Sequence, residues 1–292
     1  MIKRIGKALA VVVVALLLIV AALHFIGQSR LNTAPAVPSH VVALPSDGEA
    51  IARGDDLATI SSCKGCHGSD LGGAAFIDEA PIGYLPAPNL TRGDGGIGGR
   101  YTVEDWERAI RHGVAQDGRT LAAMPSNAFS RYSDEELGAL IAYLQQLPPV
   151  DRLLDARAIA FPGTILFGFL GSGDLPVNLI DQQAPHAQAA PRAEVSASYG
   201  EHLVTVASCQ SCHGPALDGV VNPGEPQGPN ITQGGELAEW SEAEFIAALQ
   251  QGQRPDGRPL DPEMPWAAYA RMSESDAKAI WAYLQSVPAA TP

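Results

Sequence analysis

The chain has 292 residues, of which 46% are hydrophobic and 17% are charged. This composition is typical of globular proteins and excludes a largely disordered chain. The formal net charge of −13 repels a phosphate backbone, so we expect no nucleic-acid partner.

The first 30 residues are predicted to be an N-terminal membrane anchor. Three bases, Lys3, Arg4 and Lys7, precede sixteen residues (8–23) without a polar side chain. The apolar stretch 8–27 is about as long as a membrane-spanning helix. A signal peptide is the alternative, but residues 28–31 offer no small-x-small cleavage site. The positive-inside bias places the basic end in the cytoplasm, and both interpretations export the rest of the chain.

The remainder of the sequence contains one pattern twice. The matching segments are 53–63 with 199–209, 88–91 with 229–232, 117–119 with 256–258, 124–125 with 264–265, and 142–145 with 282–285. Such self-similarity predicts two copies of one domain of about a hundred residues. We expect the first copy of the domain at 48–150, a linker at 151–192 and the second copy at 193–292.

Helix signals repeat in the same way. Four hydroxyl residues are each followed three positions later by an acidic residue, which predicts capping boxes at Thr102, Ser133, Ser241 and Ser273. Apolar residues at helical spacing follow, and prolines close the pattern near 148 and 288. No segment alternates convincingly between apolar and polar residues, so the predicted fold class is all-α.

The linker contains an apolar stretch at 158–170. Pro162, Gly163 and Gly168 interrupt it, and it is too short for a confident transmembrane helix. We expect it to pack against one or both domains, the alternative being a patch that contacts membrane or a partner. Residues 182–192 are predicted to be exposed coil.

Each copy contains a C-x-x-C-H motif, formed by Cys63, Cys66 and His67 and by Cys209, Cys212 and His213. This spacing is the attachment signal of c-type haem, with the thiols bonding the porphyrin and the histidine ligating the iron. A thioredoxin-like dithiol would need a βαβ context, and a single zinc site would need both pairs to converge. The two motifs use all four cysteines, so a pair of covalently bound haems is the preferred interpretation.

Methionine is the usual second axial ligand in cytochromes c. Met124 and Met264 align with each other, and each is followed by proline. Met272 aligns with Tyr132 and is not repeated. We therefore expect Met124 and Met264 to ligate iron, with core packing as the alternative. His112 is the rival in the first copy, but its counterpart is Gln251, which cannot replace it.

These motifs resemble the di-haem cytochrome c subunits that accompany membrane-bound bacterial dehydrogenases, over about residues 48–292. The resemblance implies that Pro88 and Pro229 orient the proximal histidines through their carbonyl groups. Four aromatic residues are equally expected to line the haems or to fill the core: Tyr101, Trp106, Trp240 and Phe245.

The expected function is electron transfer on the periplasmic side of a bacterial inner membrane. The donor would be a dehydrogenase or quinol-oxidising partner, and the acceptor a downstream cytochrome or oxidase. The alternative is a redox enzyme, such as a di-haem peroxidase or a thiosulfate-oxidising cytochrome. Such an enzyme needs an open or unusual iron site, whereas both copies retain a methionine and no spare cysteine remains.

Overall fold

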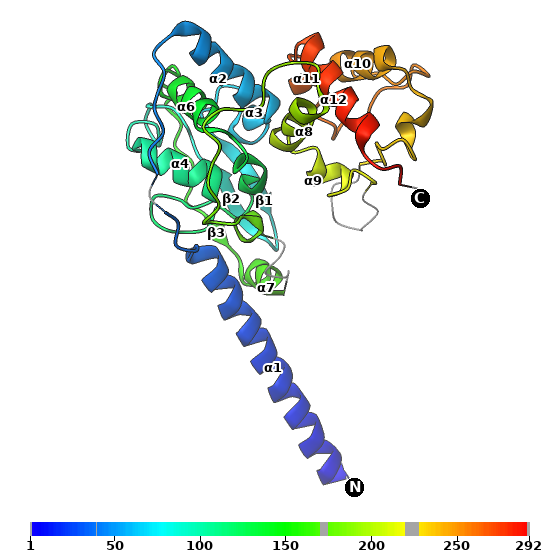
Figure 1. Ribbon diagram of the computed structural model, residues 1–292. Helices are drawn as coiled ribbons and strands as arrows, with labels where there is room; N and C mark the ends of the chain where they lie inside the picture. Colours follow the sequence, from blue (N-terminus) through cyan, green and yellow to red (C-terminus); the bar gives the residue numbers. More distant parts are fainter. Residues whose placement is uncertain (1, 39, 170–174, 220–227, 291–292) are drawn as a thin grey trace.

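A computed structural model describes residues 2–38, 40–169, 175–219 and 228–290. Helix α1 (Ile2–Asn32) projects away from a body made of two helical units (Figure 1). The first unit contains α2 (Gly48–Ile60), α3 (Cys63–His67), α4 (Val103–His112), α5 (Ser126–Phe129) and α6 (Asp134–Gln145). The second contains α8 (Ala197–Val206), α9 (Gln210–His213), α10 (Glu242–Gln251), α11 (Trp266–Tyr269) and α12 (Glu274–Ser286), with the 3-10 turn η2 (Glu236–Glu239) before α10.

The first and last helices of each unit pack closely against each other, α2 against α6 and α8 against α12. Glycine allows this approach. An added Cβ at Gly54 would overlap the Ala139 carbonyl oxygen, and one at Gly200 would overlap that of Ala279. The apolar stripes predicted from sequence line these contacts, and their leucine and isoleucine side chains form the buried core of each unit.

The four predicted capping boxes are confirmed. In each box, the hydroxyl of the cap residue accepts a hydrogen bond from the backbone N–H three residues later, and the acidic side chain at that later position accepts one from the backbone N–H of the cap residue. The cap residues are Thr102, Ser133, Ser241 and Ser273. Each cap satisfies otherwise unpaired donors and stabilises its helix by about 1 kcal/mol. Helices α4 and α10 both end at a left-handed glycine, Gly113 and Gly252, each with φ of 68°. The boundaries of both helices are thus encoded locally.

The expectation of no strands needs correction, because the mostly helical fold includes one small sheet. Strands β1 (Ala74–Glu79), β2 (Gly83–Ala87) and β3 (Ala158–Ile159) form an antiparallel sheet in the order β1-β2-β3. Ala74 pairs with Ala87, and Tyr84 pairs with Ala158. An irregular register between 75 and 77 and a two-residue third strand leave no period-2 signal in the sequence.

The linker packs against the first unit, as predicted. It supplies β3, α7 (Phe161–Phe169) and the 3-10 turn η1 (Pro176–Leu179). Helix α7 lies against the carboxyl end of α1, where His24 Nδ1 is 2.6 Å from Thr164 Oγ1 and Arg30 donates to the Gly168 carbonyl at 3.0 Å. Leu170, the last residue of the predicted apolar stretch, lies outside the described residues. The carboxyl end of α1 is thereby joined to the body of the protein.

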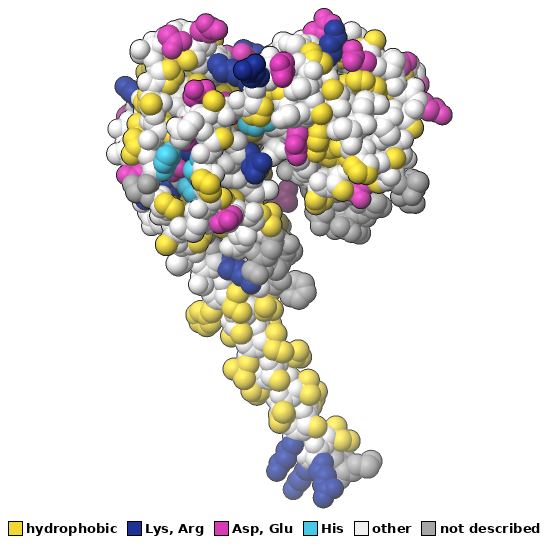
Figure 2. Space-filling model, in the orientation of Figure 1, with side chains coloured by type: hydrophobic (Ala, Val, Ile, Leu, Met, Phe, Trp, Pro, Cys, Tyr) yellow, Lys and Arg dark blue, Asp and Glu magenta, His cyan; other side chains and the backbone are white. Residues whose placement is uncertain are grey.

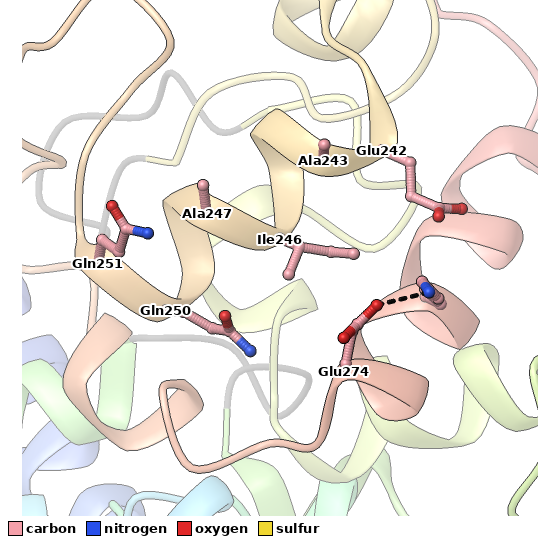
Figure 3. Close-up of a pocket in the computed structure, with 8 residues that line it drawn as sticks. Glu242, Ala243, Ile246, Ala247, Gln250, Gln251 and Glu274 are labelled. Atoms are coloured by element: carbon pink, nitrogen blue, oxygen red, sulfur yellow. Dashed lines mark ion pairs between the residues drawn. The ribbon is translucent and has the colours of Figure 1, made fainter.

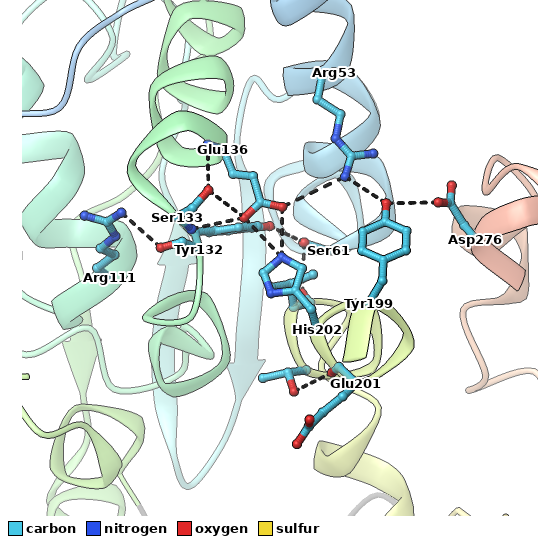
Figure 4. Close-up of polar contacts among 12 residues, drawn as sticks. Arg53, Ser61, Arg111, Tyr132, Ser133, Glu136, Tyr199, Glu201, His202 and Asp276 are labelled. Atoms are coloured by element: carbon cyan, nitrogen blue, oxygen red, sulfur yellow. Dashed lines mark hydrogen bonds and ion pairs between the residues drawn. The ribbon is translucent and has the colours of Figure 1, made fainter. Parts of the chain in front are cut away.

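Equivalent helices of the two units face each other across an interface of polar contacts (Figure 4). Arg53 on α2 donates to the hydroxyl of Tyr199 on α8, its own repeat counterpart, at 3.3 Å. His202 Nε2 lies 2.8 Å from Glu136 Oε1, and Ser61 Oγ donates to the Val206 carbonyl at 3.0 Å. The interface therefore lies beside the segments that lead into both C-x-x-C-H motifs.

Candidate haem sites

The two C-x-x-C-H motifs have the same backbone conformation. The residue before each first cysteine is left-handed, with φ of 55° at Ser62 and 59° at Ser208. The glycine after each histidine, Gly68 or Gly214, has φ of 82°. Only glycine adopts such a φ without strain, so it ends the short helices α3 and α9 directly after the histidine. The structure thus presents both motifs in one geometry.

Each motif histidine is oriented by a proline carbonyl. His67 Nδ1 lies 2.8 Å from the Pro88 oxygen, and His213 Nδ1 lies 2.8 Å from the Pro229 oxygen. Since a carbonyl can only accept, Nδ1 carries the proton and Nε2 holds the lone pair. This is the tautomer that a metal ligand bonded through Nε2 requires.

The asparagine after each proline explains why Pro-Asn-[Leu/Ile]-Thr is repeated. Asn89 Nδ2 donates to the Val150 carbonyl at 2.7 Å, and Asn230 Nδ2 donates to that of Ala290 at 2.8 Å. Each asparagine Oδ1 also accepts from the threonine two residues later. The motif therefore fixes the proline loop to the segment that follows the last helix of its unit.

A cavity in the second unit brings the predicted haem residues together. It has a volume of about 1090 Å³, part of it open to solvent, and Cys209, Cys212, His213 and Met264 all line it. Most of its remaining wall is apolar and includes Val204, Ile231, Leu237, Trp240, Phe245, Leu249, Leu260, Tyr269, Met272, Ile280 and Leu284. Two thiols, an imidazole and a thioether around an apolar cavity match the donor set and surroundings of a c-type haem.

The first unit presents the equivalent side chains in equivalent packing. Cys63 and Met124 lie half-buried against the hydrophobic core, as Cys209 and Met264 do in the second unit. Trp106 is buried in the same core, and Tyr101 stacks edge-on against it at 5.2 Å between ring centroids. The pair of aromatic residues at Trp240 and Phe245 lines the cavity of the second unit directly.

Burial favours the neutral forms of the cysteine and histidine side chains in both motifs. Burial raises the pKa of the thiols of Cys63 and Cys209 to about 12, and it also raises the pKa of Cys66 and Cys212. A reactive dithiol has the opposite shift, toward the thiolate. Burial lowers the pKa of His67 and of His213, which keeps both imidazoles neutral at neutral pH. The site is thus unsuited to thiol–disulfide exchange and suited to neutral imidazole ligation.

The alignment of the two copies did not reveal that Met272 also lines the cavity of the second unit. Its counterpart Tyr132 contacts Ser61 through its hydroxyl in the first unit. In the second unit Tyr269 takes that role, donating to the Ala207 carbonyl at 3.1 Å, and Ala207 is the counterpart of Ser61. The tyrosine that makes this contact thus lies three residues earlier in the second unit, on α11. Met272 therefore fills the space that the Tyr132 ring fills in the first unit. Only a comparison of the two packed cores shows this exchange.

Two other features lie apart from the cavity of the second unit. His112 is buried on α4, where Nδ1 lies 2.6 Å from Gln182 Oε1 of the linker. A shallow hollow between α10 and α12, beside the Glu274–Lys278 ion pair, contains neither histidine nor sulfur (Figure 3). The hollow therefore lacks the donors of a haem site.

The cytochrome c family model matches residues 51–148 and 197–288. The chain is 28% identical over 276 residues to the fructose dehydrogenase cytochrome subunit of Gluconobacter japonicus, covering 87% of this chain and 56% of that protein. It is 28% identical over 270 residues to a diheme cytochrome c-type protein of Cereibacter sphaeroides, covering 83% and 87%. The cytochrome c subunit of the quinone alcohol dehydrogenase of Gluconobacter oxydans is 28% identical over 276 residues, covering 85% and 56%. The chain thus spans little more than half the length of the two dehydrogenase subunits.

Proposed function

Because the chain belongs to the cytochrome c family, we propose that it is a di-haem electron-transfer subunit of a membrane-bound dehydrogenase system. The observation that carries this proposal is the convergence of Cys209, Cys212, His213 and Met264 on one apolar cavity. The repeat extends it to Cys63, Cys66, His67 and Met124, so each unit would hold one haem c.

Haem c supplies one-electron exchange between Fe(III) and Fe(II) when it is bound. The chain's residues then have separable roles. The cysteines would attach the macrocycle, while His67 and His213, fixed by Pro88 and Pro229, would present Nε2 to the iron. Met124 and Met264, which occur at equivalent positions of the two copies, would supply a thioether ligand to the iron and would raise its potential. With both positions filled by protein, a small molecule has no vacant site to bind.

The interface offers a short route between the two units. Ser61 is two residues before Cys63, and Val206 is three residues before Cys209. Their hydrogen bond of 3.0 Å joins the two chain segments directly (Figure 4). The contact is buried, which excludes water from the route. We infer that electrons pass between the haem sites across this part of the interface.

The N-terminal helix, as a membrane anchor, would set the location of the relay. Among the described residues one helix is long and apolar enough to cross a membrane, residues 3–32. Its apolar side chains are exposed along the projecting part of the helix, and three of its basic residues, Lys3, Arg4 and Lys7, lie at the far end (Figure 2). With that end in the cytoplasm, both haem units would lie on the periplasmic side of a bacterial inner membrane. Helix α7 would then lie where α1 leaves the bilayer.

The partners follow from the same arrangement. Relatives described as cytochrome subunits of fructose and alcohol dehydrogenases support a dehydrogenase as the electron donor. A quinol-oxidising enzyme has the same requirement for an adjacent one-electron acceptor. A downstream cytochrome or oxidase would receive the electrons, and the net charge of −13 would steer a basic carrier toward the protein.

A redox titration of the purified, detergent-solubilised protein tests this function. Two reversible one-electron transitions are expected, together with an intact mass that retains two haems after denaturation. Reduction by a dehydrogenase fraction plus its substrate should precede reduction of an added oxidised cytochrome. A protein that turns over hydrogen peroxide at a high rate, or that carries no attached haem, would contradict the proposal.

A further inference from the structure

The first unit contains a cluster of potential metal ligands that the haem function does not use. Glu107 and His112 lie on α4, and His186 comes from the linker. One ligand atom from each lies within 4.8 Å of the other two. His112 Nε2 is 3.2 Å from Glu107 Oε1, and His186 Nε2 is 4.0 Å from the same oxygen. Histidine side chains are visible on this face of the first unit in Figure 2.

The carboxylate of Glu107 is an anomaly in a folded core. Its side chain is completely buried, yet no described group donates a well-aligned hydrogen bond to either oxygen. Arg111 Nη1 is 3.5 Å from Oε1, beyond a strong charge-assisted contact. A buried carboxylate without donors is costly, and it points to a cation that satisfies it.

The hydrogen bonds of Gln182 show where that cation belongs. Gln182 Nε2 donates to the Val177 carbonyl at 2.9 Å, so its Oε1 faces His112 Nδ1 at 2.6 Å. The Nδ1 atom of His112 therefore carries the proton, and a neutral ring turns its Nε2 lone pair toward Glu107. Two lone pairs that face each other in a buried site repel unless a proton or a metal cation lies between them. A histidine that ligates a metal usually donates its other ring N–H to an oxygen acceptor, which fixes the orientation of the ring.

The charges of the cluster also favour a cation. Arg111 is the fixed positive charge, with Nη2 donating to Asp134 Oδ1 at 2.7 Å. Glu107 and Asp134 supply two negative charges against it, which leaves one uncompensated when the imidazoles are neutral.

We propose that Glu107, His112 and His186 form a binding site for a divalent transition metal of the zinc type, which fastens the linker to the first unit. Two ligands of a tetrahedral zinc ion lie about 3.3 Å apart, close to the spacing of Glu107 and His112. His186 lies on an irregular linker segment and has to move inward by about an ångström to complete the site. Water would take the fourth position, because the His186 side chain is 13% exposed.

The second unit shows that the cluster is no requirement of the haem fold. By the repeat alignment, the counterparts of Glu107 and His112 are Ile246 and Gln251. Neither side chain of this pair is a good metal ligand. The cluster occurs where the linker folds back, which matches a role in holding the linker.

Zinc titration of the full-length, haem-loaded protein in detergent tests the site, after treatment with a chelator. Haem content is measured first, so failure of haem attachment is recognised separately. Calorimetry and elemental analysis should give one zinc ion per chain. His112→Gln and His186→Gln should abolish this binding, and Gln182→Ala should weaken it about tenfold. Zinc should also slow proteolysis of the 181–192 segment.

The control is His40→Gln, because His40 lies beside His186, with ring centroids 6.0 Å apart, but contacts Asp134 at 3.1 Å and not Glu107. This variant should bind zinc as the unmodified chain does. His186 lies on the linker surface, so His186→Gln tests the site even where Glu107→Gln prevents folding. Absence of zinc binding to the unmodified chain would overturn the proposal and assign a proton to the Glu107–His112 pair. Binding that survives both histidine substitutions, or that is lost in His40→Gln, would overturn this ligand set.

Discussion

The two repeat copies share the residues that would hold the haems, and they differ where the linker contacts α4. The cysteine motifs, the histidine–proline contacts and the hydrogen bonds from Asn89 and Asn230 to backbone carbonyls have nearly the same geometry in both units. On the outer side of α4, Glu107 and His112 contact the linker, whereas the counterparts on α10 are Ile246 and Gln251. A haem bound in each unit would constrain these shared residues, whereas the residues that contact the linker could acquire a separate role.

Near the shared residues, the differences compensate one another. The tyrosine that contacts the segment before the cysteine motif is Tyr132 in one unit and Tyr269 in the other. Met272 occupies the place left by the exchange. A buried tyrosine hydroxyl needs a partner, so moving it changes both positions together. The pairing of Met124 with Met264 as ligands gains support, because Met272 has this packing role.

The largest expected effect is the loss of one haem from one unit. Cys63→Ala combined with Cys66→Ala should remove the first haem and leave the second, and Cys209→Ala combined with Cys212→Ala should do the reverse. The reason is that the cavity lined by Cys209 and Cys212 is formed by residues of the second unit alone. Intact mass after denaturation measures the result. Loss of both haems from either variant would show that the units do not fold or load independently.

Replacing an axial methionine should change one potential without removing the haem. Met124→Ala or Met264→Ala leaves thiol attachment intact and removes a ligand that favours Fe(II). One of the two reduction transitions should therefore move to lower potential, and one carbon monoxide should bind per reduced chain. Met272→Leu is the matched control, because it preserves apolar volume in the same cavity. A shift in Met272→Leu equal to that in Met264→Ala would assign the ligand to Met272.

Substitution of the glycine at the helix contact should destabilise the two units equally. Gly54→Ala and Gly200→Ala each place a Cβ against a carbonyl oxygen of the facing helix. Each substitution should lower the free energy of unfolding of its unit by about 2–3 kcal/mol. Chemical denaturation followed by haem absorbance measures both changes. Gly118→Ala should have less steric effect, since its added Cβ has no neighbour within 4 Å, although its φ of 81° adds strain.

The interface between the two units should make a smaller contribution to stability than the helix contacts, and this contribution should depend on pH. Burial raises the pKa of Glu136, but hydrogen bonds from His202 and Ser133 outweigh it and hold the pKa below the ordinary value of 4.5. A lowered carboxyl pKa stabilises the folded state above about pH 4.5, and this contribution is lost as the pH falls through the folded value. Glu136→Gln should cost about 2 kcal/mol at pH 7 and less at an acid pH below the folded pKa of Glu136.

Denaturation midpoints at both pH values measure this difference. Ser133 also depends on Glu136 for its capping box, so Ser133→Ala separates the cap from the interface. His202→Gln should reproduce only the part of the loss that comes from the interface. A Glu136→Gln variant whose deficit stays constant down to pH 3 would show that the carboxylate charge contributes nothing.

Local signals in the sequence predicted the cofactor motifs, the capping boxes and the mostly helical fold, because each depends on residues close together in the chain. The sheet was not predictable, since β3 joins a hairpin more than seventy residues earlier through two residue pairs. The interface and the Glu107 cluster depend on where the linker folds, and no short-range pattern encodes that path. The exchange of Tyr132 for Tyr269 depends on contacts with residues more than sixty positions away in the chain, which no local pattern encodes.

Carbon monoxide binding to the reduced, unmodified protein tests the central claim most directly. If His67 with Met124 and His213 with Met264 fill both axial positions of each iron, no ligand site is open at neutral pH. The account predicts negligible carbon monoxide binding while both haems remain fully reducible. Fast, stoichiometric binding to either haem would contradict it, because one methionine would then not be a ligand and the protein would have a site for catalysis.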